Sequence, residues 1–401
     1  MMIRLFKNSP VCLLVLLLSA TVSAQDNRTQ LPGILTNNTY FDANVGFINY
    51  NFTNKHLAPG FTAGSVRVPH AGVRLILYGY KLNKYLSVQV TYLRPVLWMQ
   101  FQNINGDKGN HSVVMNITGI TFKGTIPFKK KLAMYVEAGL ADVSRTGFKI
   151  NDVPVVKNAS FPTIQAGAGL TYKLNDHFSL TSYAGWSPSD SKNMQPATVF
   201  FSAGARYSVK RFSPERVAAN RNSGYIFPAN LLQVGYTSKV LNYGVNDFFS
   251  NKYFPIFWGG DVQVRSGVTV SYQRNVYHGR KTFSIDVGVS SSYWTSNLLK
   301  QHFYTVSIFP LFRFTLIHSK MTDIYFAYSV AGPSYISKFR IDETETGKHF
   351  TFQDNMGIGI YSGKHRNINA EIKIGHYSNG DLFPQNNGVM TPLTFNLGYA
   401  F

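Results

Sequence analysis

Hydrophobic and polar residues alternate along most of this chain. The segment from Lys281 to Ser290 (KTFSIDVGVS) places four apolar residues on one face: Phe283, Ile285, Val287 and Val289. Successive side chains of a strand point to opposite sides, so this period of two predicts a strand that is apolar on one face and polar on the other. Sixteen such segments can be placed, in two sets of eight. The pattern predicts an all-β fold.

The two sets of segments have similar lengths and spacings. The first lies at about residues 39–51, 68–80, 85–101, 112–126, 132–143, 159–174, 177–187 and 197–209. The second lies at about residues 230–241, 262–277, 281–294, 302–317, 323–337, 348–362, 367–378 and 390–401. Short turns alternate with longer polar connections, as in outer-membrane barrels, which have short periplasmic turns and long outer loops. We therefore expect transmembrane antiparallel β-barrels.

A polar, basic stretch at residues 210–229 separates the two sets. It contains Pro214 and Pro228 and lacks the period of two. Eight strands suffice to close a small barrel. We therefore predict two tandem eight-stranded barrels, at residues 25–209 and 230–401, with the polar stretch as their linker. The alternative is one sixteen-stranded barrel that encloses a pore, in which this stretch is a single long turn.

The first 24 residues have the pattern of a secretory signal peptide. Arg4 and Lys7 precede an apolar run from Val11 to Leu18, and the segment ends in Val22-Ser23-Ala24. Small residues mark a cleavage site, which we place after Ala24. The run is shorter than the ~20 residues of a membrane helix. The only cysteine, Cys12, lies inside this segment, so the exported chain has no disulfide, thiolate metal site or cysteine nucleophile.

The chain is strongly basic, with a net charge of +20, or +18 (20 − 2) without the two basic residues of the signal peptide. Export removes the chain from nucleic acid, so we expect anionic lipid head groups to be the partner of these charges. Each lysine or arginine near such a surface gains about 1 kcal/mol. A closed barrel satisfies every backbone hydrogen bond within lipid. These features predict a location in the bacterial outer membrane.

One serine and one histidine near the C-terminus carry candidate chemistry. Ala370, Ile372 and Ile374 share one face of a predicted strand, and the same alternation places His376 and Ser378 on that lipid-facing side. Polar groups in this position are costly and mark function. A hydroxyl beside an imidazole is the minimal pair for acyl transfer, because the histidine takes the proton as the serine attacks an ester carbonyl. A polar strand end without activity is the alternative interpretation.

The loop that follows supplies further candidates, Asn379, Asn386 and Gly388. Side-chain amides or backbone N–H groups there would stabilise an oxyanion or shape the loop. This chemistry requires neither a metal nor a cofactor. The sequence contains no HExxH, Walker A, Cys/His-cluster or GxSxG motif.

The end of the chain resembles the C-terminal signature of the PagL-type lipid A 3-O-deacylases, also described as acyloxyacyl hydrolases. The resemblance lies in His376-Tyr377-Ser378-Asn379-Gly380, in Asn387-Gly388 and in a final aromatic strand that ends on Phe401. It covers about residues 230–401, and other segments fit the same family: Phe309 to Arg313 (FPLFR), Gly332 to Ser337 (GPSYIS) and Gly357-Ile358-Gly359. The first half resembles OmpA-like barrels more weakly, through segments such as Gln165 to Leu170 (QAGAGL).

This resemblance implies an eight-stranded barrel that hydrolyses an acyl ester of lipopolysaccharide. Ser378 would be the nucleophile and His376 the general base, with Asn379, Asn386 and Gly388 as oxyanion or loop residues. The partner would be lipid A or another outer-leaflet lipid. An outer-membrane phospholipase would also use serine and histidine, so the class of ester stays open.

One departure from the family concerns the third catalytic residue. The best-studied member has a glutamate on the last strand that orients the histidine, whereas this chain reads Val389-Met390-Thr391 there. Direct spacing places Met390 at that position, face parity favours Thr391, and Asp381 is a possible substitute acid. Losing the orienting acid costs about 10⁴ in rate in the serine protease triad. The alternative function is therefore a non-catalytic structural or surface-binding barrel.

Overall fold

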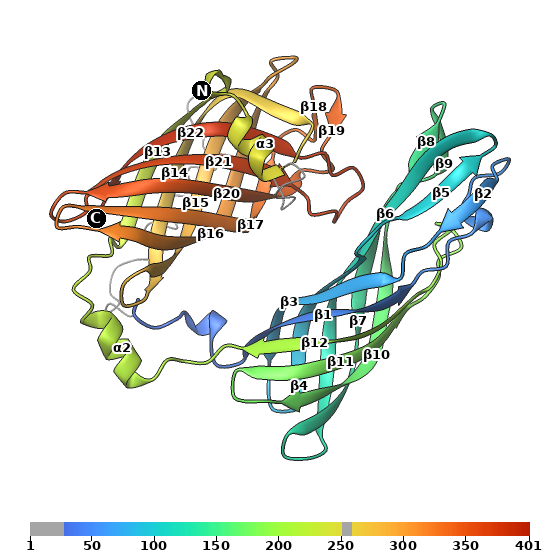
Figure 1. Cartoon of the computed structure of the whole chain (residues 1–401), viewed down its shortest axis with the longest axis horizontal. Coiled ribbons are helices and arrows are strands. Elements are labelled where there is room, and N and C mark those ends of the chain that lie inside the picture. Colours follow the sequence, from blue (N-terminus) through green and yellow to red (C-terminus); the bar gives the residue numbers. More distant parts are fainter. Residues whose placement is uncertain (1–27, 251–258) are drawn as a thin grey trace, which may run out of the picture.

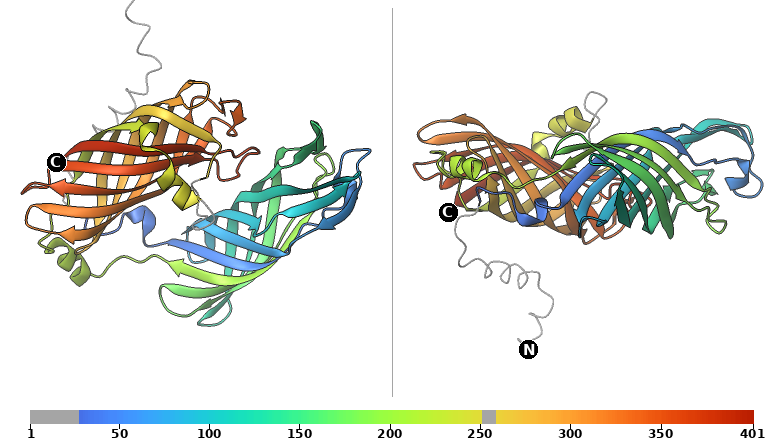
Figure 2. Two further views of the ribbon diagram at one scale, coloured as in Figure 1. Left: turned by 45° about the horizontal axis from the view of Figure 1, so that its top comes forward. Right: turned by 90° about the horizontal axis from the view of Figure 1, so that it is seen from below.

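The computed structural model describes residues 28–250 and 259–401, which form two separate closed barrels of eight antiparallel strands each (Figure 1). The views of Figure 2 show that the two sheets stay distinct and that one strand-free connection joins them. The predicted fold class is thus confirmed, and the single sixteen-stranded barrel with a pore is wrong. The expected signal peptide, residues 1–24, lies outside the described residues.

The first barrel is built from strands that each pair with the next, with the last closing on the first. These are β1 (Thr39–Asn49), β3 (Ala71–Lys81), β4 (Leu86–Pro95), β6 (Asp107–Pro127), β7 (Leu132–Thr146), β10 (Ala159–Lys173), β11 (Phe178–Ser187) and β12 (Thr198–Ser208). Four further strands extend its long-loop end: β2 (Ala63–Arg67) and β5 (Met99–Ile104), which continue the sheet from β6, and the hairpin of β8 (Phe148–Ile150) and β9 (Val153–Val156). The short helices η1 (Gly33–Leu35) and η2 (Asn54–His56) flank β1.

Buried charged pairs fill the interior of the first barrel. Arg206 donates to both carboxylate oxygens of Asp42 at 2.7 Å, and Arg74 pairs with Glu137. Glu137 also accepts a hydrogen bond of 2.8 Å from Gln89. Charges are tolerated away from water when they are paired and hydrogen-bonded. Side chains rather than a channel therefore occupy this barrel, as its strand number predicts.

The second barrel has the same construction. Its strands are β13 (Asn230–Ser238), β14 (Val262–His278), β15 (Phe283–Ser296), β16 (His302–His318), β17 (Thr322–Ile336), β20 (Phe350–Ser362), β21 (Ile368–Ser378) and β22 (Val389–Ala400), and β22 closes on β13. Outward side chains such as Ile358, Ile372 and Leu397 are exposed and apolar, whereas inward ones such as Asn369 and Glu371 are buried and polar. This division is the physical origin of the period of two.

The long loops of the second barrel carry additional structure. The β13–β14 loop contains η3 (Lys239–Leu241) and α3 (Gly244–Ser250), and the β17–β20 loop contains a small hairpin of β18 (Arg340–Ile341) and β19 (Thr344–Glu345). Asp342, in the turn of that hairpin, accepts hydrogen bonds from the hydroxyl of Ser296 and from the amides of Leu298 and Leu299. Within the described ranges, no helix is both long and apolar enough to cross a bilayer.

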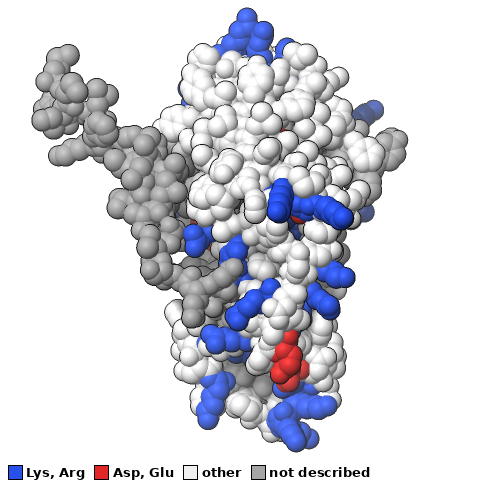
Figure 3. Space-filling model, turned by 90° about the vertical axis from the view of Figure 1, so that its left-hand side faces the viewer, with Lys and Arg blue, Asp and Glu red and all other residues white. Residues whose placement is uncertain are grey.

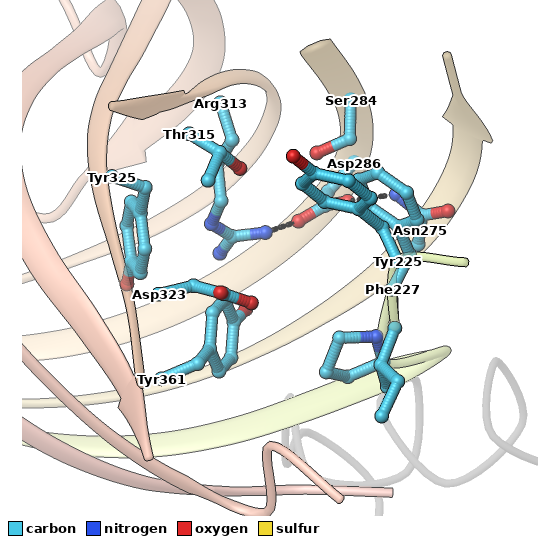
Figure 4. A pocket seen from close by; sticks show the side chains of 12 residues that line it. Tyr225, Phe227, Asn275, Ser284, Asp286, Arg313, Thr315, Asp323, Tyr325 and Tyr361 are labelled. Carbon is cyan, nitrogen blue, oxygen red and sulfur yellow. Dashed lines mark hydrogen bonds and ion pairs between the residues drawn. The ribbon is translucent and has the colours of Figure 1, made fainter. Parts of the chain in front are cut away.

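The linker contains one helix that the sequence did not predict, α2 (Pro214–Arg221), which begins after Ser213. The chain then runs across the turn end of the second barrel. Tyr225 stacks on His318 with ring centroids 4.0 Å apart, and Phe227 stacks on His278 at 4.4 Å. Both aromatic residues line a cavity of about 20 Å³ beside the buried Arg313–Asp286 ion pair (Figure 4). The linker thus covers this mouth of the barrel.

Candidate active site

Three neighbouring strands bring the candidate residues together at the long-loop end of the second barrel. On β21, His376 pairs in register with Asp354 of β20 on one side and with Met390 of β22 on the other. His376 and Ser378 share the outward parity of Ile372, as the sequence predicted. Asp354 shares the outward parity of Ile358 on β20. A histidine and a carboxylate therefore lie side by side on the outer wall.

Asp354 is the carboxylate beside His376. Its Oδ2 lies 3.6 Å from Nδ1 of His376, and the two residues are only 6% and 2% exposed. Its Oδ1 accepts a hydrogen bond of 2.6 Å from the amide of Ala331. Ala331 has a φ of 52° in an irregular step of β17, which turns that amide toward the carboxylate. Because one oxygen is held by backbone, the other remains available to orient the imidazole.

The last strand, β22, carries no acid beside His376, where the resemblance to the family places a glutamate. Between Lys373 and Gly375, β21 advances two residues while β22 advances three, from Thr394 to Thr391. Such a bulge reverses the face parity beyond it. Thr391 therefore lies beside Gly375, where its hydroxyl fills the space of a Cβ, and Met390 is the partner of His376. Met390, which direct spacing indicated, is thus the residue of β22 beside His376, and Thr391, which face parity favoured, is not.

Two glycines form the cover over the imidazole. Nε2 of His376 lies 2.7 Å from the carbonyl oxygen of Gly259, at the end of the β13–β14 loop. A Cβ on Gly388 would lie 2.6 Å from both that oxygen and Nε2. Such contacts are too short for any side chain, so position 388 requires glycine. The backbone of two loops therefore packs directly on the outward-facing histidine.

Asn379 and Asn386 hold the β21–β22 loop together. The amide of Asn379 donates to Oδ1 of Asn386 at 2.6 Å, and Nδ2 of Asn379 donates to the carbonyl oxygens of Thr346 and Gln385 at 3.3 and 3.4 Å. Asp381 accepts a hydrogen bond of 3.0 Å from Nδ2 of Asn386. Both asparagines thus make hydrogen bonds within or beside the loop, and Asp381 is bound to Asn386 there. Asp354, not Asp381, is the acid that contacts His376.

Side chains on the inward face of β21 hold the strand in place behind His376 and Ser378. Tyr377, between His376 and Ser378, points into the barrel and is 2% exposed. Its hydroxyl lies 3.0 Å from Oγ1 of Thr305 and accepts a hydrogen bond of 3.0 Å from Nε2 of Gln353. A strand fixed by buried polar contacts on one face presents its other face with a defined orientation.

The sequence reasoning missed two contributors, Asp354 and Gly259. Asp354 could have been found by continuing the parity of Ile358 and Ile360, which places a carboxylate on the lipid-facing side. An ionisable group there is expensive and marks a site. Gly259 lies 117 positions from His376 and carries no such signal. In the described part of the chain, no group of three or more His, Cys, Asp or Glu residues is placed to hold a metal ion.

Comparisons with known proteins agree with the division into halves. Residues 266–400 match the family model for lipid A 3-O-deacylase (PagL), and residues 11–208 match the model for an outer membrane protein beta-barrel domain. No curated protein matches the chain in sequence. Both families point to the bacterial outer membrane as the location.

Several solved structures are similar to one half of the chain at a time. The outer membrane enzyme PagL is 14% identical, covers 43% of this chain and 99% of its own, and has a TM-score of 0.29. The N-terminal β-barrel domain of Pseudomonas aeruginosa OprF is 16% identical, with coverages of 44% and 98% and a TM-score of 0.27. Neisserial surface protein A is 13% identical, with coverages of 42% and 96% and a TM-score of 0.28. On the family models, the C-terminal barrel matches the lipid A 3-O-deacylase family, as the resemblance of its sequence predicted, and the N-terminal half matches the outer-membrane β-barrel domain.

Proposed function

We propose that the C-terminal barrel is an outer-membrane ester hydrolase that removes an acyl chain from lipid A. The observation that carries the proposal is the contact of 3.6 Å between Asp354 and His376, on the outward face that also carries Ser378. The match of residues 266–400 to the deacylase family supports the substrate class. Cleavage of a signal peptide after Ala24, and the domain limits 25–209 and 230–401 with a linker at 210–229, belong to the same proposal.

The three residues have distinct roles in this mechanism. Nε2 of His376 takes the proton of Ser378 as its oxygen attacks the ester carbonyl, and the sugar hydroxyl leaves with that proton. Water then hydrolyses the acyl-serine, with His376 again acting as the general base. Asp354 holds the Nδ1–H tautomer and stabilises the imidazolium that forms at each step, as the aspartate does in the serine protease triad. Its carboxylate arrives from β20, on the opposite side of β21 from the position of the family's glutamate.

The oxyanion of this reaction needs hydrogen-bond donors at the same face. Asn379, Asn386 and Gly388 follow Ser378 in the sequence, and the backbone of Gly388 is the part of the loop that packs on His376. We assign Gly388 to positioning the loop against the imidazole, and we assign the two asparagines to holding the loop in that position. Neither assignment requires a metal or a cofactor.

Binding of substrate must displace one contact. A carbonyl oxygen only accepts hydrogen bonds, so Nε2 of His376 carries a hydrogen when it faces the oxygen of Gly259. In that arrangement it cannot accept the proton of Ser378. The proposed mechanism therefore requires the contact between His376 and Gly259 to be broken when substrate binds.

Purified protein in detergent provides a direct test. Hexa-acylated lipid A and a phosphatidylethanolamine with matched chains are offered separately, and the released fatty acids are quantified by gas chromatography. The proposal predicts release from lipid A that is lost in Ser378→Ala. Release from the phospholipid alone would reassign the ester class, and no release from either would reject a hydrolase.

A second function has one observation in its favour. Met390 occupies the position beside His376 where the family's acid is expected, which is consistent with a structural or surface-binding barrel that has lost activity. Asp354 favours the hydrolase, because an ionisable group on the lipid-facing wall of a barrel is costly and marks a functional site.

A further inference from the structure

The turn end of the first barrel opens into a basic cavity that the proposed hydrolase does not use. The cavity has a volume of about 580 Å³ and lies on the barrel axis, among the turns that follow β3, β6 and β10. Figure 3 views the molecule from this side and shows lysine and arginine side chains gathered around the end of the first barrel, in the lower part of the picture, with few acidic side chains among them. Its volume falls in the range of small-molecule sites, about 300–1,000 Å³.

Most of the positive charges around this cavity have no acidic partner. Lys173 pairs with Asp176 at 2.6 Å, and Arg206 pairs with Asp42. The remaining cations of the lining form no ion pair within the described residues: Lys81, Lys84, Lys129, Lys130, Lys131 and Lys210. Like charges held around one opening repel one another and favour a bound counter-ion.

A buried amine lies beneath the opening. Lys123 is 1% exposed. It lies two residues before Thr125 on the inward face of β6, so it is farther from the turn end than Thr125, which lines the cavity. Its Nζ lies 3.7 Å from the ring centroid of Tyr135 and has no hydrogen-bond partner within the described part of the chain. An unsatisfied buried donor is costly unless something completes its contacts. Lys123 does not itself line the cavity, and its amine lies against the rings of Tyr135 and Tyr40 beneath the opening.

The lysines and hydroxyl groups that line the cavity indicate which class of ligand would bind there. Ammonium groups act as compact point charges that suit phosphate oxygens, and the hydroxyls of Ser87, Thr125 and Thr171 add donors between them. We propose that the turn end of the first barrel binds an anion with several phosphate groups, and that the six unpaired lysines supply most of the affinity. The site is separate from Ser378 and does not depend on the proposed hydrolase.

Calorimetric titration of the purified full chain with tripolyphosphate, in a neutral detergent, tests this site. The proposal predicts saturable binding with one site per chain, which weakens steeply as salt rises. The variant Lys129→Gln/Lys130→Gln/Lys131→Gln removes three lysines from exposed turns and should weaken binding about ten-fold or more. The control Lys55→Gln/Lys108→Gln/Lys149→Gln removes the same charge from exposed positions at the other end of the same barrel and should bind as wild type.

A parallel arm replaces tripolyphosphate with micelles that contain phosphatidylglycerol. Binding with the same dependence on Lys129 to Lys131 would identify a lipid headgroup as the source of the phosphate, and binding of tripolyphosphate alone would identify a soluble anion. Equal losses in both triple variants would show non-specific attraction to a basic protein and overturn the site. Absence of saturable binding in both arms would also overturn it. Circular dichroism and the gel shift of the folded barrel verify that each variant is folded.

Discussion

Asp354 on β20 lies directly across from His376 on β21, with its Oδ2 3.6 Å from the Nδ1 of the imidazole. Both face outward, and both are nearly inaccessible to solvent. The acid thus reaches the histidine from the strand before it, while the last strand offers Met390. On the outer wall of a barrel, either neighbouring strand can place a side chain beside a given residue, because each pairs with it in register.

Replacing this acid should impair catalysis without unfolding the barrel. In Asp354→Asn the amide cannot stabilise an imidazolium, so we expect the deacylation rate to fall by about 10²–10⁴ while substrate binding changes little. Steady-state rates of fatty-acid release measure the effect. The matched control is Asp381→Asn, whose carboxylate contacts Asn386 within the loop and which should keep most of the activity. Equal losses in both variants would contradict the role of Asp354.

A single methyl group at position 388 should disturb the site. A Cβ there lies 2.6 Å from Nε2 of His376, so Gly388→Ala must shift either the imidazole or the loop, and we expect a loss of about 100-fold in rate. Gly244→Ala is the control, because no atom lies within 4 Å of its added Cβ. Wild-type activity in Gly388→Ala would mean that the close packing of the loop on His376 has no part in catalysis.

The turn residue Asp342 should make the β15–β16 loop sensitive to acid. Burial alone would raise the pKa of its carboxyl, but the hydrogen bonds from Ser296, Leu298 and Leu299 outweigh it and lower the pKa. A lowered pKa means that the carboxylate stabilises the loop above the ordinary pKa of about 4, and that this stability is lost as the pH falls through the lowered value.

Amide hydrogen exchange can follow this loop. Protection of the Leu298 and Leu299 amides should fall in acid, after correction for intrinsic exchange, and should be lost at all pH values in Asp342→Ala. The expected cost of that substitution is about 1–3 kcal/mol of local stability. Unchanged protection in the variant would show that other contacts hold the loop.

Breaking the buried Arg313–Asp286 ion pair of the second barrel should destabilise the fold. Among the described residues, Arg313→Met leaves the buried Asp286 with Asn275 as its one side-chain hydrogen-bond partner, at 2.7 Å. We therefore expect a loss of about 3–5 kcal/mol in the free energy of unfolding. Urea unfolding in lipid vesicles measures it. The double variant Arg313→Met/Asp286→Leu should recover much of the loss, because it removes both charges. A double variant that is less stable than the single one would contradict this view of the interior.

The sequence predicted the barrel strands closely because each one has a lipid face and a polar face. It missed β2 and β5, which continue the sheet beyond the barrel and need no such alternation. It also missed α2, a short helix set by the Ser213 cap and Pro214 rather than by an apolar face. Parity placed His376 and Ser378 correctly, yet it failed at Thr391, because the bulge in β22 depends on pairing with β21, which one strand's sequence does not reveal.

Ser378 is the residue on which the proposed acyl transfer from lipid A depends. Mass spectrometry of lipid A from cells that produce the protein, beside cells that produce Ser378→Ala at equal levels in the outer membrane, tests it most directly. We expect loss of one acyl or hydroxyacyl mass with the natural serine and intact lipid A with the variant. Identical, fully acylated lipid A in both, with the barrel folded, would contradict it.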